Sequence, residues 1–308
     1  SSKGYNGAIK VHSLKSSEEF DISGNMNFNE FNPLYGLKNY GFTSLTGNII
    51  FQWQKHYSAS ELSAHVNLDD GLFFKQNFNS LQADLSMKNH NDQYIMKSSG
   101  LLKGLHYEPY IWDSLHFQID YSDNNLSYYK FKAISTLGDV LELHGERWIN
   151  GEYYISDFEG TLNQIKLNAQ PFYINNKDNY FNFPEVNVKL GDSELQLSGN
   201  YGSKYYYKIK GNILNLDLEK FYSIIGKSYR INGTIIKAAI NIEKNGDQFH
   251  PNPIIFTSFN LKEGNIDEIQ YNSLNISSSF RDRRLLISEL QLDTHLGNIT
   301  GDGWINLG

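Results

Sequence analysis

The sequence predicts an all-β fold built from repeated antiparallel hairpins, and two observations point to it. Apolar residues recur at every second position in short segments separated by Gly, Asn and Asp, which is typical of strands with one buried face. Aromatic residues make up 14% of the chain, with 21 Tyr and 19 Phe among 308 residues. Because such residues favour half-buried pleated surfaces, the composition also favours strands over a thick helical core.

The clearest unit lies at residues 264–307 and begins with a Gly-led motif. In this motif a Gly is followed, after six intervening residues, by Phe or Tyr and then by Asn-Ser-Leu. The motif occurs at residues 71–81 and 264–274, and a version with one additional residue occurs at residues 104–115. Self-similarity of this kind predicts an architecture in which each unit covers its neighbour.

The remaining elements can be placed along the chain from the same signals. Edge-like strands are expected within residues 9–28, and further strands at residues 47–53 and 62–68. Turns are expected where Gly, Pro, Asn and Asp gather. They fall at residues 31–36, 69–71, 245–247 and 281–284.

A short helix is predicted at residues 217–226, where the two-residue alternation stops. Asp217 is suited to cap the N-terminus, Leu218, Phe221 and Ile225 have helical spacing, and Gly226 supplies a C-terminal stop. We expect the apolar side of this helix to dock on the sheet.

Charge and composition exclude several classes of partner and site. The formal net charge is -7 and the basic residues are scattered, which argues against a nucleic-acid partner. The one basic cluster, at residues 281–284, is expected to be a solvated hairpin tip. The absence of cysteine excludes disulfides and thiolate metal sites. No apolar run approaches the length of about 18 residues needed for a membrane span.

The sequence contains no recognisable catalytic motif. The 9 histidines show no metal-ligand spacing. His116 and His144 are expected in neighbouring strands, where a structural or solvent-facing role is favoured over a metal pair. Nucleophile-elbow and phosphate-loop motifs are absent. A pair of carboxylates across a cleft, as a glycosidase needs, stays open on a β scaffold. We therefore expect no enzyme, no metal and no cofactor.

The apolar face of such strands must be covered by a second sheet, by helices or by a ligand. One predicted helix is too little to cover it. The alternatives are a closed sandwich, in which the face is ordinary core, and a sheet curled around its own apolar face. For an arbitrary β protein the sandwich is the more common solution.

The Gly-led motif, the Leu-x4-Leu-x-Leu run after it and the ending Leu-Gly-Asn-x-x-Gly-x-Gly resemble the AsmA-like/TamB family. Residues 213–307 carry the likeness best, including the helix after Asp217 and the strand start Ile231-Asn-Gly233. Residues 60–200 match more weakly, and residues 1–45 hardly match. The resemblance implies an elongated, repeat-built antiparallel β-groove, or β-taco, with one or two short helices and an apolar concave face. Residues 1–308 would form one continuous groove segment of a longer protein.

The resemblance also implies a function. Members of the family are anchored in the inner membrane of diderm bacteria, cross the periplasm and conduct phospholipid acyl chains between inner and outer membrane, supporting outer-membrane biogenesis. We therefore expect phospholipid as the ligand, and an outer-membrane assembly barrel protein as a partner of a C-terminal part beyond this stretch. Strands of about 20 residues spaced about 4.8 Å apart would give a groove roughly 70 Å long.

Candidate groove-lining residues come from the apolar positions of the expected strands. A slip of one residue in register would move each of them to the other face. Exposed aromatic residues along an open seam are also expected. The candidate groove-lining residues are Phe51, Trp53, Val66, Leu85, Phe117, Ile119, Val188, Leu197, Ile240, Ile242, Ile276, Leu290 and Leu292.

The alternative function is that of a carbohydrate-binding or adhesive β-sandwich.

Overall fold

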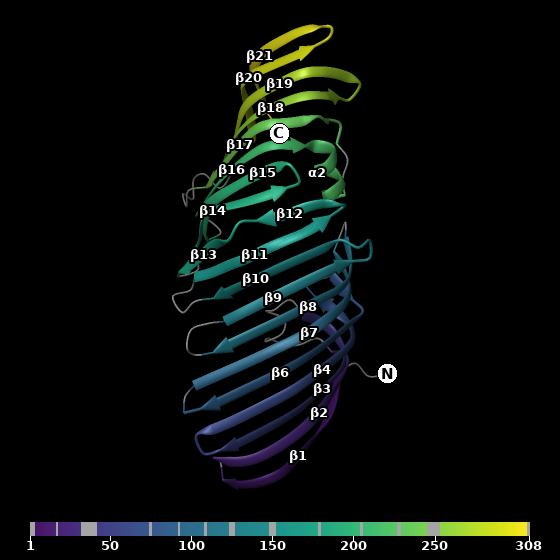
Figure 1. Ribbon diagram of the computed structural model, residues 1–308, viewed down its shortest axis with the longest axis vertical. Coiled ribbons are helices and arrows are strands. Elements are labelled where there is room, and N and C mark those ends of the chain that lie inside the picture. The colour runs from purple at the N-terminus through teal and green to yellow at the C-terminus, as the bar shows by residue number, and fades with distance from the viewer. Residues whose placement is uncertain are drawn as a thin grey trace. The chain divides into compact units, whose positions relative to one another are not determined.

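The computed structural model (Figure 1) describes residues 4–16, 18–31, 42–73, 76–91, 93–107, 110–122, 127–147, 152–177, 180–203, 206–226, 229–244 and 253–306. These ranges contain strands β1 to β21 and the short helix α2. The strands pair in antiparallel fashion, so the predicted all-β fold with a short helix is confirmed. The chain divides into two compact units, unit 1 at Ser1–Ile149 and unit 2 at Asn150–Gly308.

Unit 1 is an antiparallel meander in which each long strand pairs with the next one along the chain. The short strand β5 lies beside the end of β4, which then continues its pairing with β6. The strands are β1 (Gly4–Ser16), β2 (Glu19–Phe31), β3 (Phe42–His56), β4 (Ala59–Phe73), β5 (Gln76–Phe78), β6 (Ser80–His90), β7 (Gln93–Tyr107), β8 (Tyr110–Ser122), β9 (Ser127–Ser135) and β10 (Val140–Arg147).

Unit 2 is also a meander, with one irregularity at its start. There β11 pairs with both β12 and β13, and β14 pairs with the same two strands from the other side. From β14 onward each strand pairs with the next. The elements are β11 (Glu152–Leu162), β12 (Ile165–Ala169), β13 (Phe172–Lys177), β14 (Tyr180–Leu190), β15 (Ser193–Ser203), β16 (Tyr206–Asp217), α2 (Leu218–Ile225), β17 (Thr234–Lys244), β18 (Ile254–Ile266), β19 (Ile269–Arg281), β20 (Arg284–Thr294) and β21 (Gly297–Asn306).

The register separates apolar from polar residues onto opposite faces of unit 1. Residues directly opposite each other in paired strands share a face, and successive residues of a strand alternate between faces. Ile49, for example, is opposite Val66, which is opposite Ala83. The neighbouring positions on the other face are polar, as where Gln52 is opposite Ser63 and Ser63 is opposite Ser86. We call the two surfaces the apolar face and the polar face of the unit.

Unit 2 shows the same separation. Ile209 is opposite Ile242, which is opposite Ile255, and the row continues to Phe280 and Leu285 on the apolar face. On the polar face the rows contain mainly amide, hydroxyl and charged side chains. One of them runs through Asn187, Gln196, Asn212, Ala239, Ser258 and Ser277.

The Gly-led motif is a hairpin in which the glycine faces an aromatic ring. Gly71 is opposite Phe78 in unit 1, and Gly264 is opposite Tyr271 in unit 2. Both rings are almost fully buried, with exposures of 2% and 1%. A Cβ at either glycine would collide with the opposite aromatic side chain, so the motif needs Gly at this position. The longer version differs, because Trp112 is opposite Leu105 and not Gly104.

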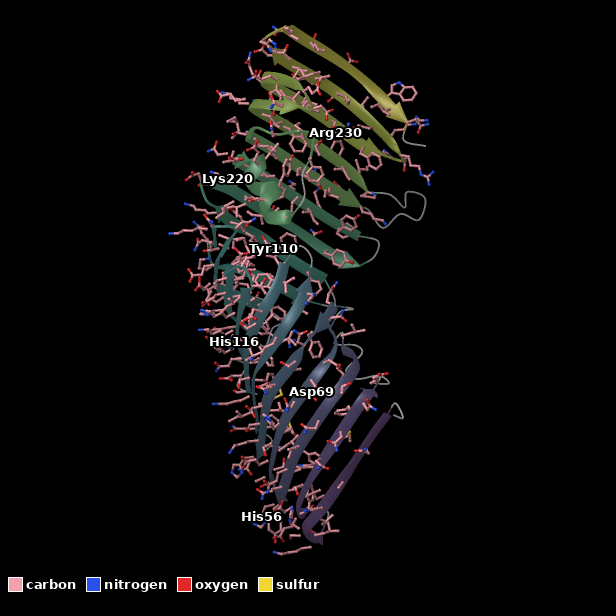
Figure 2. The ribbon with its side chains drawn as sticks, turned by 90° about the vertical axis from the view of Figure 1, so that its right-hand side faces the viewer. His56, Asp69, Tyr110, His116, Lys220 and Arg230 are labelled. Carbon is pink, nitrogen blue, oxygen red and sulfur yellow. The ribbon has the colours of Figure 1, made fainter. Side chains whose placement is uncertain are left out.

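Helix α2 confirms the prediction for residues 217–226. The Asp217 carboxylate accepts hydrogen bonds from the backbone N–H groups of Glu219 and Lys220 at 3.0 and 3.1 Å. Gly226 ends the helix in the left-handed conformation, with φ of 65°. Leu218 and Ile224 are buried against the sheet, whereas Lys220, labelled in Figure 2, is exposed.

The predicted turn at the basic tip, residues 281–284, is confirmed, and three expectations need correction. Hairpin turns are also found near residues 137–139, 190–192 and 296–298. The turn expected at residues 69–71 is wrong, because β4 runs on to Phe73. The turns expected at residues 31–36 and 245–247 lie mostly or wholly outside the described residues.

The other two corrections concern strand length and the histidines. The longest strands contain 15 residues, fewer than the 20 or so assumed from the sequence. His116 and His144 are not in neighbouring strands. Strand β9 lies between them, with Lys132 opposite His116 and Lys130 opposite His144.

Candidate functional site: an apolar trough in each unit

On the apolar face of unit 1, the side chains are buried at one end of the strands, which we call the closed end. They are exposed to solvent at the other end, which we call the open end. At the closed end, Leu68 and Leu102 are 3% and 4% exposed. At the open end of the same face, Trp53 and Tyr121 are 42% and 40% exposed. In β4, Leu68 lies at the closed end and Leu62 lies at the open end. The six residues from one to the other correspond to about 20 Å along the strand. We call this graded surface the apolar trough.

The closed end of the trough in unit 1 is a small hydrophobic core. It forms because β3 and β4 continue past their flat central parts, through register shifts near Thr46 and Gly47. The buried cluster there consists of Phe28, Leu45, Leu68, Phe78, Leu81, Leu102 and Leu105.

Unit 2 has a trough of the same kind. Leu261 and Leu274 are 4% and 1% exposed at the closed end, whereas Leu197 and Tyr201 are 41% and 47% exposed toward the open end. Tyr271 fixes this closed end, since its hydroxyl donates a hydrogen bond to the carbonyl of Asn232. Burial raises the pKa of the Tyr271 hydroxyl, with a smaller contribution from Tyr222. Tyr271 is therefore a neutral structural hydrogen-bond donor.

The loop after α2 stabilises the closed end of unit 2 through backbone hydrogen bonds to the hairpin between β18 and β19. The backbone N–H of Asp267 donates to the carbonyl of Arg230 at 2.7 Å, and the Arg230 Nε lies 3.5 Å from the Asp267 carboxylate. Arg230 is labelled in Figure 2. Ile231 forms an isolated bridge with Ile266. Because the two partners are more than half exposed, we assign the backbone bonds more weight than the ion pair.

No second sheet layer covers the apolar face in the described residues of either unit. Their strands pair edge to edge with neighbours in a meander. The closed sandwich is therefore not the arrangement found. Between the closed and open ends, residues such as Phe51, Leu85 and Ile240 stay partly exposed.

Glycines in the middle of strands receive aromatic rings from the neighbouring strand. Gly24 is opposite Phe51, Gly100 is opposite Phe117, and in each pair the ring fills the space beside the glycine. Tyr129 covers Gly145 in the same way. These contacts partly bury large aromatic rings on the apolar face without a second layer.

All candidate lining residues lie on the apolar face of their unit. In unit 1, Trp53 lies nearest the open end, Phe51, Leu85 and Ile119 share the next row of opposed residues, and Val66 lies one row deeper. Phe117 shares the row of Val66 through Ala83 and Gly100.

In unit 2 the candidates follow the same order. Ile242 lies nearest the open end, followed by the row of Leu197 and Ile240. Val188, Ile276 and Leu290 share the next row, and Leu292 lies deepest, opposite Leu274. That these residues contact lipid stays a prediction.

Exposed aromatic residues gather toward the open end of the trough, as expected for an open seam. In unit 1, Trp53 makes an edge-to-face contact with Phe20 at a ring distance of 4.9 Å. Tyr94 and Tyr121, on the same face, are 42% and 40% exposed. In unit 2, Phe181 is opposite Tyr201, and both are exposed. Amphipathic rings of this kind suit a boundary between apolar surface and water.

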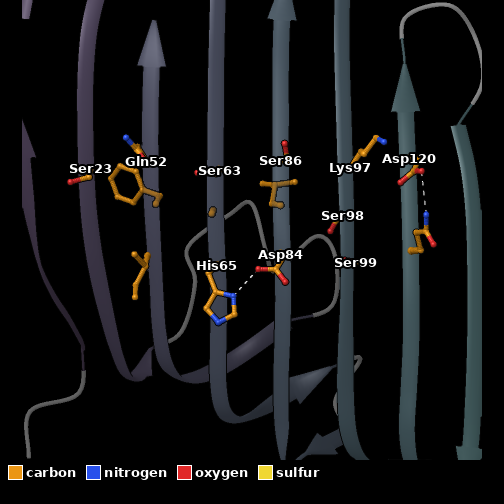
Figure 3. Close-up of a pocket in the computed structure, with 15 residues that line it drawn as sticks. Ser23, Gln52, Ser63, His65, Asp84, Ser86, Lys97, Ser98, Ser99 and Asp120 are labelled. Atoms are coloured by element: carbon orange, nitrogen blue, oxygen red, sulfur yellow. Dashed lines mark hydrogen bonds and ion pairs between the residues drawn. The ribbon is translucent and has the colours of Figure 1, made fainter. Parts of the chain in front are cut away.

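The polar face of unit 1 has a shallow hollow of different chemistry (Figure 3). Small side chains such as Ser63 and Ser86 leave space between longer ones. His65 Nδ1 lies 2.8 Å from the Asp84 carboxylate, but the two side chains are 51% and 76% exposed. Such an exposed pair is well hydrated and contributes little. Nowhere in the described ranges do three or more His, Cys, Asp or Glu residues form a metal site.

Sequence reasoning missed three cations on the apolar face. Lys55 lies two residues beyond Trp53 in β3, Arg147 two beyond Gly145 in β10, and Lys244 two beyond Ile242 in β17. The alternation that placed the lining residues, carried one step further along each strand, would have found them.

Comparisons with known proteins add no identification. No family model, no curated protein and no solved structure matches the chain. Among the described residues, no helix has the length and apolar character needed to cross a membrane.

Proposed function

We propose that the apolar trough of each unit binds the acyl chains of phospholipids, with the head group in water at the open end. One observation carries the proposal. In the described part of each unit, the sheet presents an apolar face that grades from buried leucines to exposed aromatics, and no described segment forms a layer over its middle. Extensive apolar surface left open in this way marks a binding surface.

The energetics favour a long, flexible apolar ligand. Burial of a methylene group gives about 0.8 kcal/mol. A tail in the trough contacts protein on one side and is partly open to water on the other, so each methylene gains a fraction of that amount. A chain of many methylenes would still accumulate several kcal/mol, whereas a small polar ligand would gain almost nothing.

The apolar face has few hydrogen-bonding side chains that a ligand would have to satisfy. Thr257 and Ser278 are opposite each other on the apolar face of unit 2, and their hydroxyls hydrogen-bond at 2.7 Å. Because they satisfy each other, an acyl chain can pass them without leaving a lost hydrogen bond. Such an even surface supports sliding of the ligand more than tight binding at one point.

The resemblance to the AsmA-like/TamB family supports a larger role for the same surface. We propose that these troughs belong to a periplasmic protein of a diderm bacterium. The longer protein would be anchored in the inner membrane, conduct phospholipid toward or from the outer membrane, and contact an outer-membrane assembly barrel protein.

Tryptophan quenching by brominated acyl chains tests lipid contact directly, because the chain places tryptophans on opposite faces. Trp53 lies on the apolar face, whereas Trp304, opposite Leu286, lies on the polar face. Both are exposed, at 42% and 70%. Two variants would each retain one of these tryptophans, with Phe at the other three Trp positions.

We expect monomeric phospholipid with brominated tails to quench Trp53 strongly and Trp304 weakly. A water-soluble quencher serves as the control, since it should reach both residues. Equal quenching of the two by the brominated lipid, or no quenching of Trp53, would contradict acyl-chain binding on the apolar face.

A further inference from the structure

The charges on the apolar face are distributed unlike those of the whole chain. Lys55 is opposite Phe20 and Ser60, Arg147 is opposite Ser127, and Lys244 is opposite Tyr207. Lys55 and Lys244 each lie one inward-facing position past the apolar rows, about 7 Å further toward the open end. Arg147 lies at the end of the row that contains Trp53. Lys55 and Arg147 therefore lie at the rim of the trough in unit 1, and Lys244 lies at the rim of the trough in unit 2.

The rows between these cations and the closed end contain no carboxylate. In unit 1 the described rows that include Trp53, Phe51 and Val66 consist of apolar and aromatic residues, glycine, Ser98, Ser127 and Arg147. In unit 2 the rows that include Ile242 and Ile240 add only Thr257 and Ser278. Yet the chain has 34 acidic and 27 basic residues. These rows therefore exclude acidic residues.

Several cations on the polar face pair with carboxylates. There Lys132 pairs with Glu142, Lys88 with the Glu61 carboxylate at 2.7 Å, and Lys208 with the Glu243 carboxylate at 3.5 Å. Each of these pairs joins residues directly opposite each other in neighbouring strands. The polar face is therefore a mixed-charge surface, typical of solvation. At the rim, Lys55 is opposite Phe20, and Lys244 is opposite Tyr207.

We propose that the trough prefers anionic phospholipids, with Lys55, Arg147 and Lys244 contacting the head-group phosphate or its anionic substituent. This inference rests on the proposed function, since it assumes that the acyl chains lie in the trough. Long basic side chains can lay their methylenes along an apolar surface while the charged end reaches the phosphate. A lipid with net negative charge meets complementary charge at the rim, whereas a zwitterionic lipid gains less from the same cations.

Calorimetric titration with two short-chain lipids tests the preference. Phosphatidylglycerol and phosphatidylcholine with identical acyl chains would be used below their micelle-forming concentrations. We expect the wild-type chain to bind phosphatidylglycerol at least about fivefold more tightly, given the modest strength of exposed ion pairs. The preference should fall as the salt concentration rises.

The triple variant Lys55→Gln, Arg147→Gln, Lys244→Gln should bind both lipids equally while retaining affinity for phosphatidylcholine. A charge-matched control, Lys97→Gln, Lys210→Gln, Lys237→Gln, removes three cations from the polar face. It should keep the full preference. If the triple rim variant does not fold, Lys244→Gln alone should show a partial loss.

The outcomes separate the two proposals. Binding of both lipids by the wild type with equal affinity overturns the anionic preference and leaves acyl-chain binding intact. Binding of neither lipid overturns acyl-chain binding itself. A preference that both triple variants lose to the same extent would show a general charge effect, and this too overturns a specific role of the rim. Displacement of the lipid by inorganic phosphate alone would also contradict joint recognition of tail and head group.

Discussion

Gly100 and Phe117 lie directly opposite each other where β7 pairs with β8, and the ring of Phe117 fills the space beside the glycine. A Cβ at Gly100 would lie 2.5 Å from Cζ of the ring and 2.6 Å from the carbonyl oxygen of Gln82. This contact illustrates how the trough buries a large aromatic residue without a second sheet. Because a side chain at position 100 would displace the ring of Phe117, Gly100 also determines the position of this candidate lining residue.

Gly100→Ala should therefore destabilise the protein, since the ring and the neighbouring backbone must both move. We expect the free energy of unfolding to fall by about 1–3 kcal/mol, the usual range for overpacking. Gly301→Ala is the matched control, because it lies on the apolar face opposite Leu290 with nothing within 4 Å of an added Cβ. Chemical denaturation should show the loss only for Gly100→Ala; equal effects would contradict the packing argument.

Tyr271→Phe should weaken the closed end of unit 2. The variant loses the hydrogen bond from the Tyr271 hydroxyl to the Asn232 carbonyl in a site where the ring is 1% exposed. Loss of a buried hydrogen bond should cost about 1–3 kcal/mol if the carbonyl finds no other donor. Tyr57→Phe, at a ring that is 62% exposed, should leave the denaturation midpoint unchanged. Similar midpoints for both variants would exclude a stabilising role for the Tyr271 hydroxyl.

Asp217→Ala should destabilise α2 by removing the side-chain cap from two backbone N–H groups. The expected cost is about 1 kcal/mol. Asp217→Asn retains a capping oxygen and should recover most of the stability. Thermal unfolding of the three proteins tests the ranking. An Asn variant no more stable than the Ala variant would indicate that the charge of Asp217 matters and not its capping oxygen.

Lys132→Met should alter the pH dependence of stability through Glu142. A hydrogen bond from Lys132 holds the pKa of the Glu142 carboxyl below its usual value of 4.5, outweighing the opposing effect of partial burial. A carboxyl with a lowered pKa in the folded state stabilises the protein above the unfolded pKa, and this contribution is lost as pH falls through the folded pKa.

The stability difference between wild type and Lys132→Met should therefore be largest near neutral pH and vanish in acid, once the pH has fallen below the lowered pKa of the Glu142 carboxyl. Since the two side chains are 40% and 22% exposed, its size should be about 0.5 kcal/mol. Carbon-detected NMR titration should show a higher Glu142 pKa in the variant. An unchanged pKa would contradict the assigned cause. Lys97→Met, on the same polar face, should leave the Glu142 pKa where it is.

The fold was largely predictable because its signals are local. Alternation marked the strands, Asp217 and Gly226 marked the helix, and the Gly-led motif marked two equivalent hairpins. The turn expected after Asp70 was wrong because Gly71 serves a contact with Phe78 inside the continuing hairpin. From the sequence alone, Gly71 is taken for a strand break. The ring that requires a glycine there belongs to Phe78 in the neighbouring strand, and this contact is visible only in the structure.

The choice of face was also predictable, but the gradient along it was not. Alternation grouped Phe51 with Trp53 and Leu290 with Leu292, and the register shows that these groups belong to one face of each unit. The buried Leu45 was missed because its strand continues past a register shift that alternation does not reveal. The rim cations were missed because candidates were sought among apolar residues alone.

A photo-crosslinking residue introduced in cells tests the central claim most directly. Ile240 and Leu292 lie on the apolar face, whereas Ala239 and Gln291, their neighbours in the same strands, lie on the polar face. We predict phospholipid adducts at positions 240 and 292 and few at positions 239 and 291. Folded protein with no adduct at either apolar position, or with equal yields on the two faces, would contradict lipid binding in the trough.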